Sequence, residues 1–201
     1  MASPGRLVTI EGIDGAGKTT LCSGLAAALP DATLLREPGG VELAERIREL
    51  VKDPALEVDP RAEALLYAAA RAQLVASLVR PLLEEGRLVL LDRFVDSSLA
   101  YQGAGRGLGV AQVRAINDFG TGGLTPDRTL LLRLDPAVGR ARQAGRGEAP
   151  DRLELEDEAF FAAIARCYDE LAAAEPGRFR VLDAAAPAAD VLSAALEAIA
   201  P

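Results

Sequence analysis

The sequence predicts an α/β fold in which helices cover both faces of a mostly parallel β-sheet. Short runs rich in Val, Ile and Leu alternate along the chain with longer stretches of helical period, as buried parallel strands and their connecting helices do. Each apolar run is bounded by Gly, Pro, Asp or another charged residue. The chain has 201 residues, of which 50% are hydrophobic, and this composition fits a single domain (residues 1–201) with one core.

Five short segments are the predicted strands of this sheet. They are residues 7–11, 33–36, 88–92, 129–134 and 179–182. Because helical stretches separate them, consecutive strands are expected to pair in parallel.

Apolar residues at helical spacing mark three of the connecting helices. We expect these residues to face the core: Leu43, Ile47, Leu50 and Val51, then Phe161, Ile164, Tyr168 and Leu171, then Leu192, Ala195, Leu196 and Ile199. Two further helices are expected to start at the pairs Asp59-Pro60 and Asp135-Pro136. In each pair Asp caps the helix, and Pro takes the first helical position, where its missing N–H costs nothing.

Two longer segments differ sharply in composition. Residues 61–85 are rich in Ala and Leu and contain no helix breaker before Pro81, which predicts a long helix across the middle of the molecule. Residues 141–152 carry two glycines and a proline between arginines, and this pattern predicts a mobile surface loop.

The charged residues limit the classes of partner and reaction. Lys and Arg number 22 against 30 Asp and Glu, and the net charge of -8 disfavours nucleic acid as a partner. The chain contains no histidine, which excludes Ser-His-Asp hydrolysis, Cys-His proteolysis and His-ligated zinc chemistry in their usual forms.

The remaining composition predicts a soluble cytoplasmic protein without a membrane segment. The two cysteines, Cys22 and Cys167, cannot build a disulfide framework, and both are expected to be thiols in the core. No stretch reaches the roughly 18 uninterrupted apolar residues that a membrane span needs.

The strongest motif lies between the first predicted strand and a helical run at residues 21–29. It reads Gly-Ile-Asp-Gly-Ala-Gly-Lys-Thr and is a complete G-x-x-x-x-G-K-[ST] motif. Its glycines let successive backbone N–H groups point at phosphate oxygens, while the lysine reaches the β and γ phosphates. A nucleoside triphosphate is therefore expected to bind at Gly12, Ile13, Asp14, Gly15, Ala16, Gly17, Lys18, Thr19 and Thr20.

The end of the third predicted strand separates the classes of P-loop protein. Asp92 stands where a Walker-B carboxylate would, so Thr19 and Asp92 are the expected Mg²⁺ ligands. The next residue is Arg93, and not the Glu with which mechanical ATPases activate water. No Asn-Lys-x-Asp guanine signature occurs. These observations favour a kinase, since phosphoryl transfer needs positioning and cations and no histidine base.

Four further segments carry a resemblance to a known family. In order along the chain they are Arg36-Glu37-Pro38-Gly39-Gly40, Tyr67-Ala68-Ala69-Ala70-Arg71, Asp92-Arg93-Phe94 with Ser97-Ser98-Leu99-Ala100-Tyr101-Gln102-Gly103, and Asp151-Arg152-Leu153-Glu154. Together with the P-loop they make the chain similar to the thymidylate kinase (dTMP kinase) family over nearly its whole length. The resemblance implies the P-loop nucleoside monophosphate kinase fold, ATP and Mg²⁺ as donor and cofactor, transfer of the γ-phosphoryl group of ATP to dTMP to give dTDP, and a homodimer.

The resemblance also assigns the acceptor side. Arg36 ends one predicted strand and Arg93 directly follows another, at the edge where such sheets bind ligands, and both are expected to clamp the phosphate of dTMP. Tyr67 and Arg71 share one helix face and are implied to stack and read the thymine. Asp14 is implied to contact the sugar hydroxyl of the acceptor or the Mg²⁺ shell, and Tyr101 is implied to pack against the sugar and exclude a ribose. Ser98 is implied to lie near the base of dTMP, and Ser97 and Gln102 are implied to belong to the same dTMP-binding segment.

The catalytic cations are implied to be Lys18, Arg93 and a lid arginine, with Asp14 beside them. Because position 15 is Gly, the P-loop lacks the arginine that one branch of the family carries there. The lid, residues 141–152, is therefore expected to supply the cation, with Arg146 the first candidate and Arg142, near ATP, the second.

Three positions differ from the family pattern. Tyr67 replaces the more usual Phe, and Ala70 and Leu74 stand where an acidic residue and a His are common. They keep open a kinase for another (deoxy)nucleoside monophosphate. A P-loop switch that binds nucleotide without transferring phosphate is a further alternative, although it has no use for arginines on the acceptor side.

Overall fold

Five parallel strands form one sheet in the order β2-β3-β1-β4-β5 in the computed structural model, which describes residues 5–145, 147 and 151–200. They are β1 (Arg6–Glu11), β2 (Thr33–Arg36), β3 (Leu88–Asp92), β4 (Arg128–Arg133) and β5 (Phe179–Asp183). The predicted sheet is confirmed, with β4 beginning and ending one residue earlier than expected.

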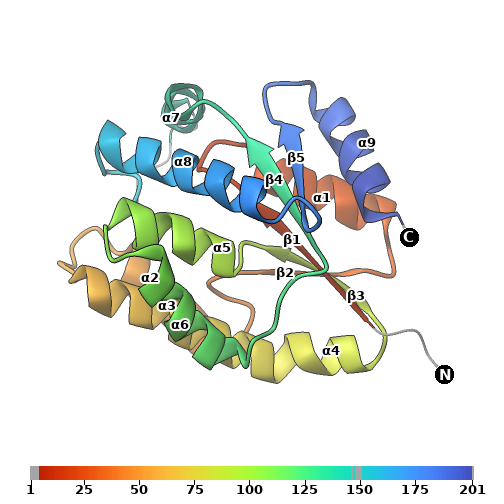
Figure 1. Cartoon of the computed structure of the whole chain (residues 1–201), viewed down its shortest axis with the longest axis horizontal. Coiled ribbons are helices and arrows are strands. Elements are labelled where there is room, and N and C mark those ends of the chain that lie inside the picture. The colour runs from red at the N-terminus through yellow and green to blue at the C-terminus, as the bar shows by residue number, and fades with distance from the viewer. Residues whose placement is uncertain (1–4, 146, 148–150, 201) are drawn as a thin grey trace.

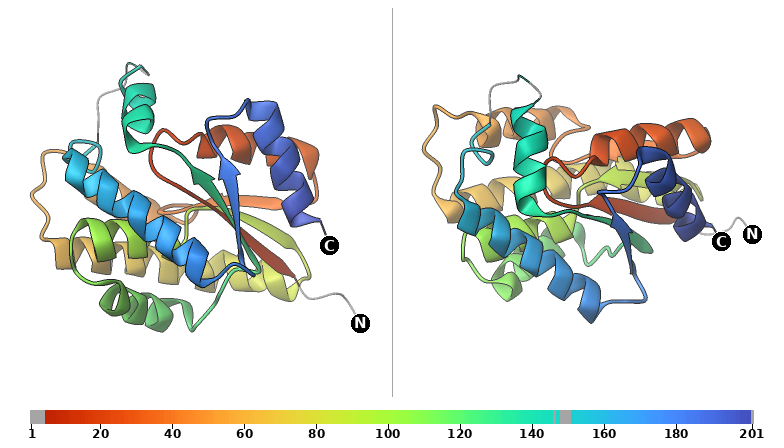
Figure 2. Two further views of the ribbon diagram at one scale, coloured as in Figure 1. Left: turned by 45° about the horizontal axis from the view of Figure 1, so that its top comes forward. Right: turned by 90° about the horizontal axis from the view of Figure 1, so that it is seen from above.

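Helices cover both faces of the sheet (Figures 1 and 2). On one face lie α1 (Lys18–Ala28) and α9 (Ala188–Ile199), which contact each other. The other face is covered by α8 (Glu158–Ala174) and by a long helical rod that packs against β3. The inner strands β1, β3 and β4 are therefore buried on both sides, as their continuous apolar runs predict.

The long rod corresponds to the predicted helix at residues 61–85, but its middle is wider than an α-helix. It consists of α3 (Pro60–Leu74), a π-helical segment η1 (Val75–Val79) and α4 (Arg80–Glu84). The N–H of Arg80 donates to the carbonyl of Val75, five residues back, directly before Pro81. Pro81 has no N–H to donate, which explains why the i to i−4 hydrogen bonds of the α-helix are interrupted here.

Length and composition alone would let the rod, Pro60–Glu84, cross a membrane. In the fold it packs against α2 (Glu42–Lys52), α6 (Val110–Thr121) and the sheet. It also buries Glu63 and Arg71 in ion pairs. The rod is therefore a core helix of this α/β fold.

The remaining helices frame the carboxyl edge of the sheet. They are α5 (Val95–Ser98), the π-helical segment η2 (Leu99–Gly105) and α7 (Pro136–Ala144). The predicted loop at residues 141–152 is wrong at its start, because α7 continues through Ala144. Its end is not contradicted: Asp151 and Arg152 lie in no helix or strand, and the chain returns to the core at Leu153.

The helical stripes are mostly confirmed. Phe161, Ile164, Tyr168 and Leu171 are all buried, as are Ala195 and Ile199. On α2, however, Leu43 and Leu50 are about half exposed, and the buried residues are Ala44, Ile47 and Val51. The prediction for Leu43 and Leu50 is wrong because α2 packs on α3 through a narrower stripe than its apolar residues span.

The strand order places a ligand site at the carboxyl edge. After β1 the chain passes over β3 to form β2 at one edge of the sheet. After β3 it passes over β1 in the opposite direction to form β4. Parallel sheets bind ligands where the direction of winding reverses, outside the carboxyl ends of the strands. The segments that follow β1, β2 and β3 all meet there.

Candidate active site

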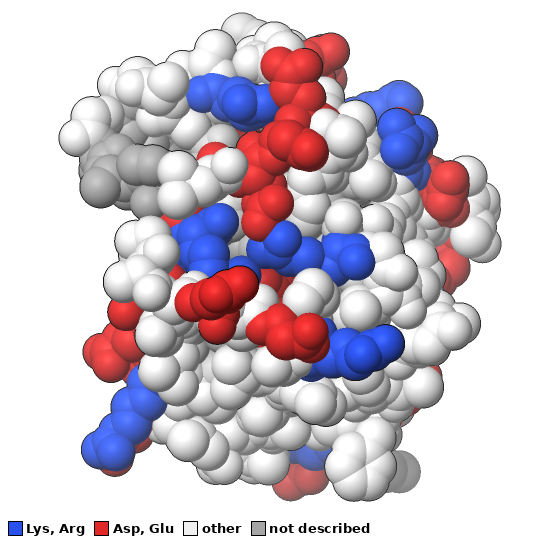
Figure 3. All heavy atoms as spheres, turned by 90° about the vertical axis from the view of Figure 1, so that its left-hand side faces the viewer, with Lys and Arg blue, Asp and Glu red and all other residues white. Residues whose placement is uncertain are grey.

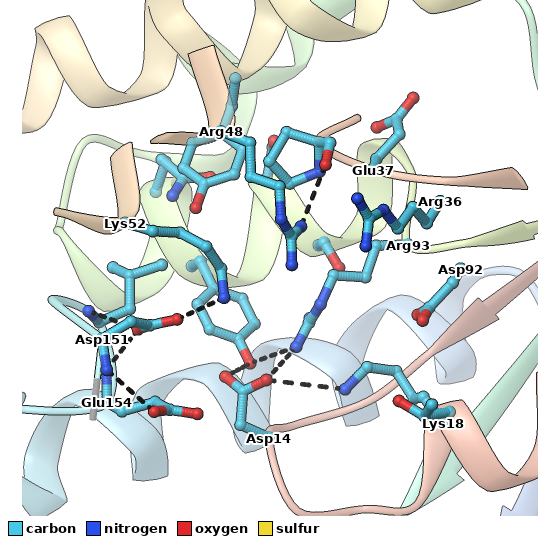
Figure 4. A pocket seen from close by; sticks show the side chains of 18 of the residues that line it. Asp14, Lys18, Arg36, Glu37, Arg48, Lys52, Asp92, Arg93, Asp151 and Glu154 are labelled. Carbon is cyan, nitrogen blue, oxygen red and sulfur yellow. Dashed lines mark hydrogen bonds and ion pairs between the residues drawn. The ribbon is translucent and has the colours of Figure 1, made fainter. Parts of the chain in front are cut away.

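A cavity of about 420 Å³ opens at this edge (Figure 4), and it falls in the size range of small-molecule sites. On the side of the molecule seen in Figure 3, Lys and Arg side chains gather next to Asp and Glu. The cavity brings together fourteen of the residues expected from the sequence: Asp14, Gly15, Gly17, Lys18, Thr19, Arg36, Tyr67, Arg71, Asp92, Arg93, Ser97, Ser98, Tyr101 and Gln102.

The P-loop takes its shape from glycines that tolerate left-handed backbone angles. Gly15 has φ 79° and Gly17 has φ 93°, which a side chain would strain. A Cβ at Gly15 would also lie 2.2 Å from the carbonyl oxygen of Gly139 in α7. The loop is therefore packed against α7, and α1 begins directly at Lys18, three residues earlier than expected.

Lys18 is buried and turned back onto the loop that precedes it. Its Nζ donates to the carbonyl oxygens of Gly12 at 3.0 Å and Ile13 at 2.9 Å, and it lies 3.8 Å from Oδ1 of Asp14. Burial and the nearby Arg93 lower the pKa of Lys18 to about 8. Its ammonium is held by neutral carbonyls, which a phosphate oxygen would outcompete as a charged acceptor.

Asp14 connects the P-loop to the end of β3. Its carboxylate forms an ion pair with Arg93 and accepts a hydrogen bond of 2.7 Å from the Tyr101 hydroxyl. Burial would raise the pKa of Asp14, but Arg93, Lys18 and the Tyr101 hydroxyl outweigh it and bring the value to about 2. The Arg93 guanidinium lies 5.0 Å above the Tyr101 ring. These three side chains form one charged unit in the cavity wall.

Asp92 lies at the end of β3, in the register that pairs it with Ile10 on β1. Its Oδ1 is buried and has no hydrogen-bond partner among the described residues. Asp92 and the exposed Thr19 hydroxyl both line the cavity. A carboxylate oxygen and a hydroxyl are the hard ligands that Mg²⁺ prefers, so these residues fit that ion.

Arg71 is almost fully buried on α3 and is held by four partners. Its Nε donates to Oε2 of Glu37 at 2.7 Å, and Nη1 donates to Oγ of Ser98 at 2.9 Å and to Asn117. Nη2 donates to the carbonyl of Phe94 at 2.9 Å. Four of its five N–H groups are therefore engaged, and Arg71 enters the cavity wall with a fixed direction.

Glu37 is a cavity residue to which the sequence analysis gave no role, although it belongs to the motif at residues 36–40. Its side chain is buried and lines the cavity, while Oε1 has no hydrogen-bond partner among the described residues. Burial raises the pKa of Glu37 to about 7, although the ion pair with Arg71 acts in the opposite direction.

Tyr67, Gln102 and the two serines take less direct positions. Tyr67 lines the cavity, and burial raises the pKa of its hydroxyl. Gln102 is buried, and its Nε2 donates to Glu63 at 2.8 Å. The hydroxyls of Ser97 and Ser98 are also bonded within the protein, that of Ser98 to Arg71.

Two of the three positions that differ from the family pattern lie behind the cavity wall. Ala70 packs with the buried residues of α2, and Leu74 packs in the cluster under β3. Neither is among the described residues that line the cavity. Their side chains therefore have no direct path to a base in the cavity, and Tyr67 is the one differing position that reaches it.

The expected arginines are distributed unevenly. Arg36 lies at the cavity rim with its Nη2 3.0 Å from Glu45. Arg142 points away, donating to the carbonyl of Ala184 at 3.0 Å, and is not among the described lining residues. Arg146 lies outside the described residues. The role of each as a lid arginine stays a prediction.

Further lining residues were missed from the sequence. They are Pro38, Arg48, Lys52, Asp151, Leu153 and Glu154, besides Glu37. Nζ of Lys52 lies 2.7 Å from Oδ2 of Asp151, and Arg48 donates to the carbonyl of Pro38 at 3.0 Å. The sequence did contain a signal for these two residues. Lys52 is one of only two lysines, and it lies four residues after Arg48, so both side chains share one face of α2.

The chain is similar in sequence to known proteins over most of its length. The family model described as thymidylate kinase matches residues 10–195. A thymidylate kinase of Deinococcus radiodurans is 54% identical and covers 92% of this chain and 91% of its own length. One of Lactobacillus delbrueckii subsp. bulgaricus is 46% identical, covering 97% and 95%.

A solved structure is also similar over almost the whole chain. The crystal structure of thymidylate kinase from Ehrlichia chaffeensis superposes with a TM-score of 0.79 at 28% identity. The match covers 98% of this chain and 100% of that one.

Proposed function

Because this chain belongs to the thymidylate kinase family and catalyses the ATP-dependent phosphorylation of dTMP to dTDP, we propose how its cavity divides between the two nucleotides. The observation that supports the division is that one cavity contains the P-loop lysine and the charged unit of Asp14, Arg93 and Tyr101. A donor and an acceptor that meet there would face each other across a single transferring phosphoryl group.

The donor side is the P-loop, residues 12–20. Its backbone N–H groups and the N-terminus of α1 bind the phosphates of ATP. Lys18 leaves the carbonyls of Gly12 and Ile13 and pairs with the β and γ phosphates. Its burial keeps water away from that charge, which strengthens the pairing.

Thr19 and Asp92 hold Mg²⁺. The unpartnered Oδ1 of Asp92 supports this assignment. No group of three or more Asp, Glu, Cys or His suited to a metal occurs among the described residues. This fits an ion that takes one or two protein ligands, with phosphate oxygens and waters supplying the rest. When bound, Mg²⁺ neutralises the charge of the phosphates.

The acceptor side lies between β2, α3 and η2. Arg93 and Arg36 contact the phosphate of dTMP, and Tyr101 with Asp14 borders the sugar. Tyr67, Arg71, Ser98 and Gln102 border the thymine, where the remaining Nη2 N–H of Arg71 is suited to a carbonyl oxygen of the base.

Transfer then depends on position and on positive charge. Lys18 and Arg93 lie on either side of Asp14, so both cations are available where negative charge moves from donor to acceptor. Residues 141–152 close over ATP, with Arg146 as the proposed lid cation. Arg142 would need to leave the carbonyl of Ala184 to contribute.

Steady-state assays with ATP and a series of acceptors test the division. dTMP, dUMP, dCMP and dGMP share the phosphate and sugar but differ in the base. We expect dTMP to give the highest kcat/KM. Equal use of dCMP or dGMP would show that Arg71 and its neighbours do not read the base.

We also propose that the chain forms a homodimer and works in the cytoplasm. Exposed apolar side chains lie on α3 and on the two helices that it contacts: Leu43 and Leu50 on α2, Leu65 on α3 and Phe119 on α6, the last 92% exposed. Both cysteines are buried free thiols, which suits a reducing compartment.

Light scattering after size exclusion tests the dimer. The molar mass of the wild type should be twice 21.0 kDa, and Phe119→Asp should lower the measured mass toward that of the monomer. Val181→Asp, at an exposed apolar residue of the edge strand β5, is the matched control and should leave the mass unchanged. A monomeric wild type would overturn the homodimer.

A further inference from the structure

Arg93 has an unusual backbone conformation. Its φ is 69°, and among the residues that the structure describes it is the one non-glycine with a positive φ. A residue with a Cβ keeps this conformation only when its surroundings hold it there. What holds the backbone of Arg93 therefore also sets the direction in which its side chain leaves β3.

The end of β1 holds the backbone on both sides of Arg93. The N–H of Arg93 donates to the carbonyl of Ile10 at 3.0 Å. The next N–H, that of Phe94, donates to Oε1 of Glu11 at 2.7 Å, and the N–H of Ser97 donates to the same oxygen at 3.3 Å. Glu11 thus binds the first turn of α5, which begins directly after Phe94.

The other oxygen of Glu11 reaches the side chain of Arg93 through a serine. Oγ of Ser97 donates to Oε2 of Glu11 at 2.5 Å, and Nη1 of Arg93 donates to Oγ of Ser97 at 3.1 Å. The hydroxyl of Tyr168 on α8 also donates to Oε2, at 2.9 Å. One carboxyl group therefore joins β1, α5 and α8 around the arginine.

Glu11 does not itself reach a ligand. Its residue is 0% exposed, and it is not among the described residues that line the cavity. Its side chain is bonded to two backbone N–H groups and two hydroxyls, so a buried polar group is fully used inside the protein. A residue that only filled the core would be apolar.

We propose that Glu11 is a positioning residue for phosphoryl transfer, because it holds both the left-handed backbone and the side chain of Arg93 in the direction of the acceptor phosphate. The inference rests on the proposed function, in which Arg93 contacts that phosphate. It assigns Glu11 a task in acceptor binding that its place one residue before the P-loop does not suggest.

A double-mutant cycle in the full-length enzyme tests the proposal. The variants are Glu11→Ala, Arg93→Ala and the double variant, each measured for the KM of dTMP, the KM of ATP and kcat. Glu11→Ala should raise the KM of dTMP by about tenfold or more, since a small misplacement of a catalytic group is costly. The KM of ATP should change by less than about threefold. The double variant should be no worse than Arg93→Ala, because Glu11 acts through Arg93.

The outcomes separate this proposal from the proposed function. If Arg93→Ala leaves the KM of dTMP and kcat unchanged, Arg93 does not serve the acceptor, and both fail. If Arg93→Ala raises that KM but Glu11→Ala does not, or if the two effects add in full, the positioning role alone is overturned. Equal increases in the KM of dTMP and of ATP would likewise mean that Glu11 only supports the fold near the P-loop.

Two further variants guard against loss of folding. Glu11→Gln keeps a carbonyl oxygen for the N–H of Phe94, and it should recover most of the dTMP affinity lost in Glu11→Ala. Ser97→Ala removes the hydroxyl that joins Oε2 of Glu11 to Nη1 of Arg93 but leaves the bonds from Glu11 to the N–H groups of Phe94 and residue 97 in place, and it should raise the KM of dTMP several-fold. An unchanged value would overturn the proposal even if Glu11→Ala did not fold. Asp127→Asn is the control, since Asp127 accepts a hydrogen bond from the N–H of Leu7 at the opposite end of β1. It should lower the Tm and leave the KM of dTMP within about twofold.

Discussion

Asp14 and Arg93, 79 residues apart in sequence, form an ion pair across the cavity between the P-loop and the end of β3. The Tyr101 hydroxyl donates to the second oxygen of the same carboxylate at 2.7 Å. Asp14 therefore orients the arginine and the tyrosine together.

Asp14→Asn should lower kcat/KM for dTMP by about tenfold or more, because Arg93 loses its charged partner and an amide holds a guanidinium less firmly. Since the pKa of Asp14 is brought to about 2, any loss of activity between about pH 6 and pH 4 should persist in the variant. Asp31→Asn, at an exposed carboxylate, is the control. A variant with wild-type kinetics would remove Asp14 from the site.

Lys18→Ala should lower kcat by about 100-fold or more while the KM of dTMP changes little. The reason is that the ammonium stabilises charge that develops on the transferring phosphoryl group, and not the bound acceptor. Initial rates at saturating ATP and varied dTMP measure both constants. A change confined to the KM of dTMP would place Lys18 on the acceptor side.

Arg71→Ala should raise the KM of dTMP and also destabilise the fold by about 3 kcal/mol or more, because Glu37 is left buried without its partner and three further buried acceptors lose their donor. Arg71→Lys should not restore the KM, since an ammonium cannot reproduce four directed hydrogen bonds from one planar group. Urea unfolding and steady-state kinetics measure the two effects. An unchanged KM in a destabilised variant would make Arg71 purely structural.

Tyr101→Ala should reduce the preference for dTMP over its ribonucleotide counterpart by about tenfold, because it removes the ring that we propose excludes a 2′-hydroxyl. Tyr101→Phe keeps the ring and should keep the preference, although its dTMP affinity falls with the loss of the bond to Asp14. The ratio of kcat/KM values for the two acceptors is the readout. Equal ratios in wild type and Tyr101→Ala would assign the selection to another residue.

Glu37 should make stability depend on pH in an unusual direction. Burial raises its pKa in the folded chain to about 7, above the 4.5 of a free Glu side chain. The folded state therefore binds the proton more tightly, and this contribution is complete below about pH 4.5 and is lost as the pH rises through about 7. The free energy of unfolding of the wild type minus that of Glu37→Gln should decrease from about pH 5 to pH 7 and then level off, as urea titrations would show. A difference that rises with pH would contradict the raised pKa.

Much of the fold and the phosphate site could be predicted because the signals are local. The apolar runs of β2 and β3 are bounded by residues that end strands, and the P-loop is contiguous, so its glycines specify the loop without help from distant segments. Arg93 and Tyr101, which line the cavity, lie in motifs of similar length.

The remaining features depend on partners that the order of residues does not reveal. Leu43 and Leu50 have the spacing of core residues, but only the packing of α2 on α3 leaves them exposed. Lys52 becomes a cavity residue because Asp151 lies 2.7 Å away, and Arg71 is immobilised by Glu37, Ser98, Asn117 and Phe94.

A parallel α/β sheet, a P-loop after its first strand and the exclusion of histidine chemistry can all be inferred from the order of residues. Which carboxylates lie beside which arginines, and so which charges are fixed, buried or shifted in pKa, is known only from the folded chain. Hydrophobic period and turn chemistry act over a few residues, whereas a buried ion pair exists only once separate segments have been brought to one edge of the sheet.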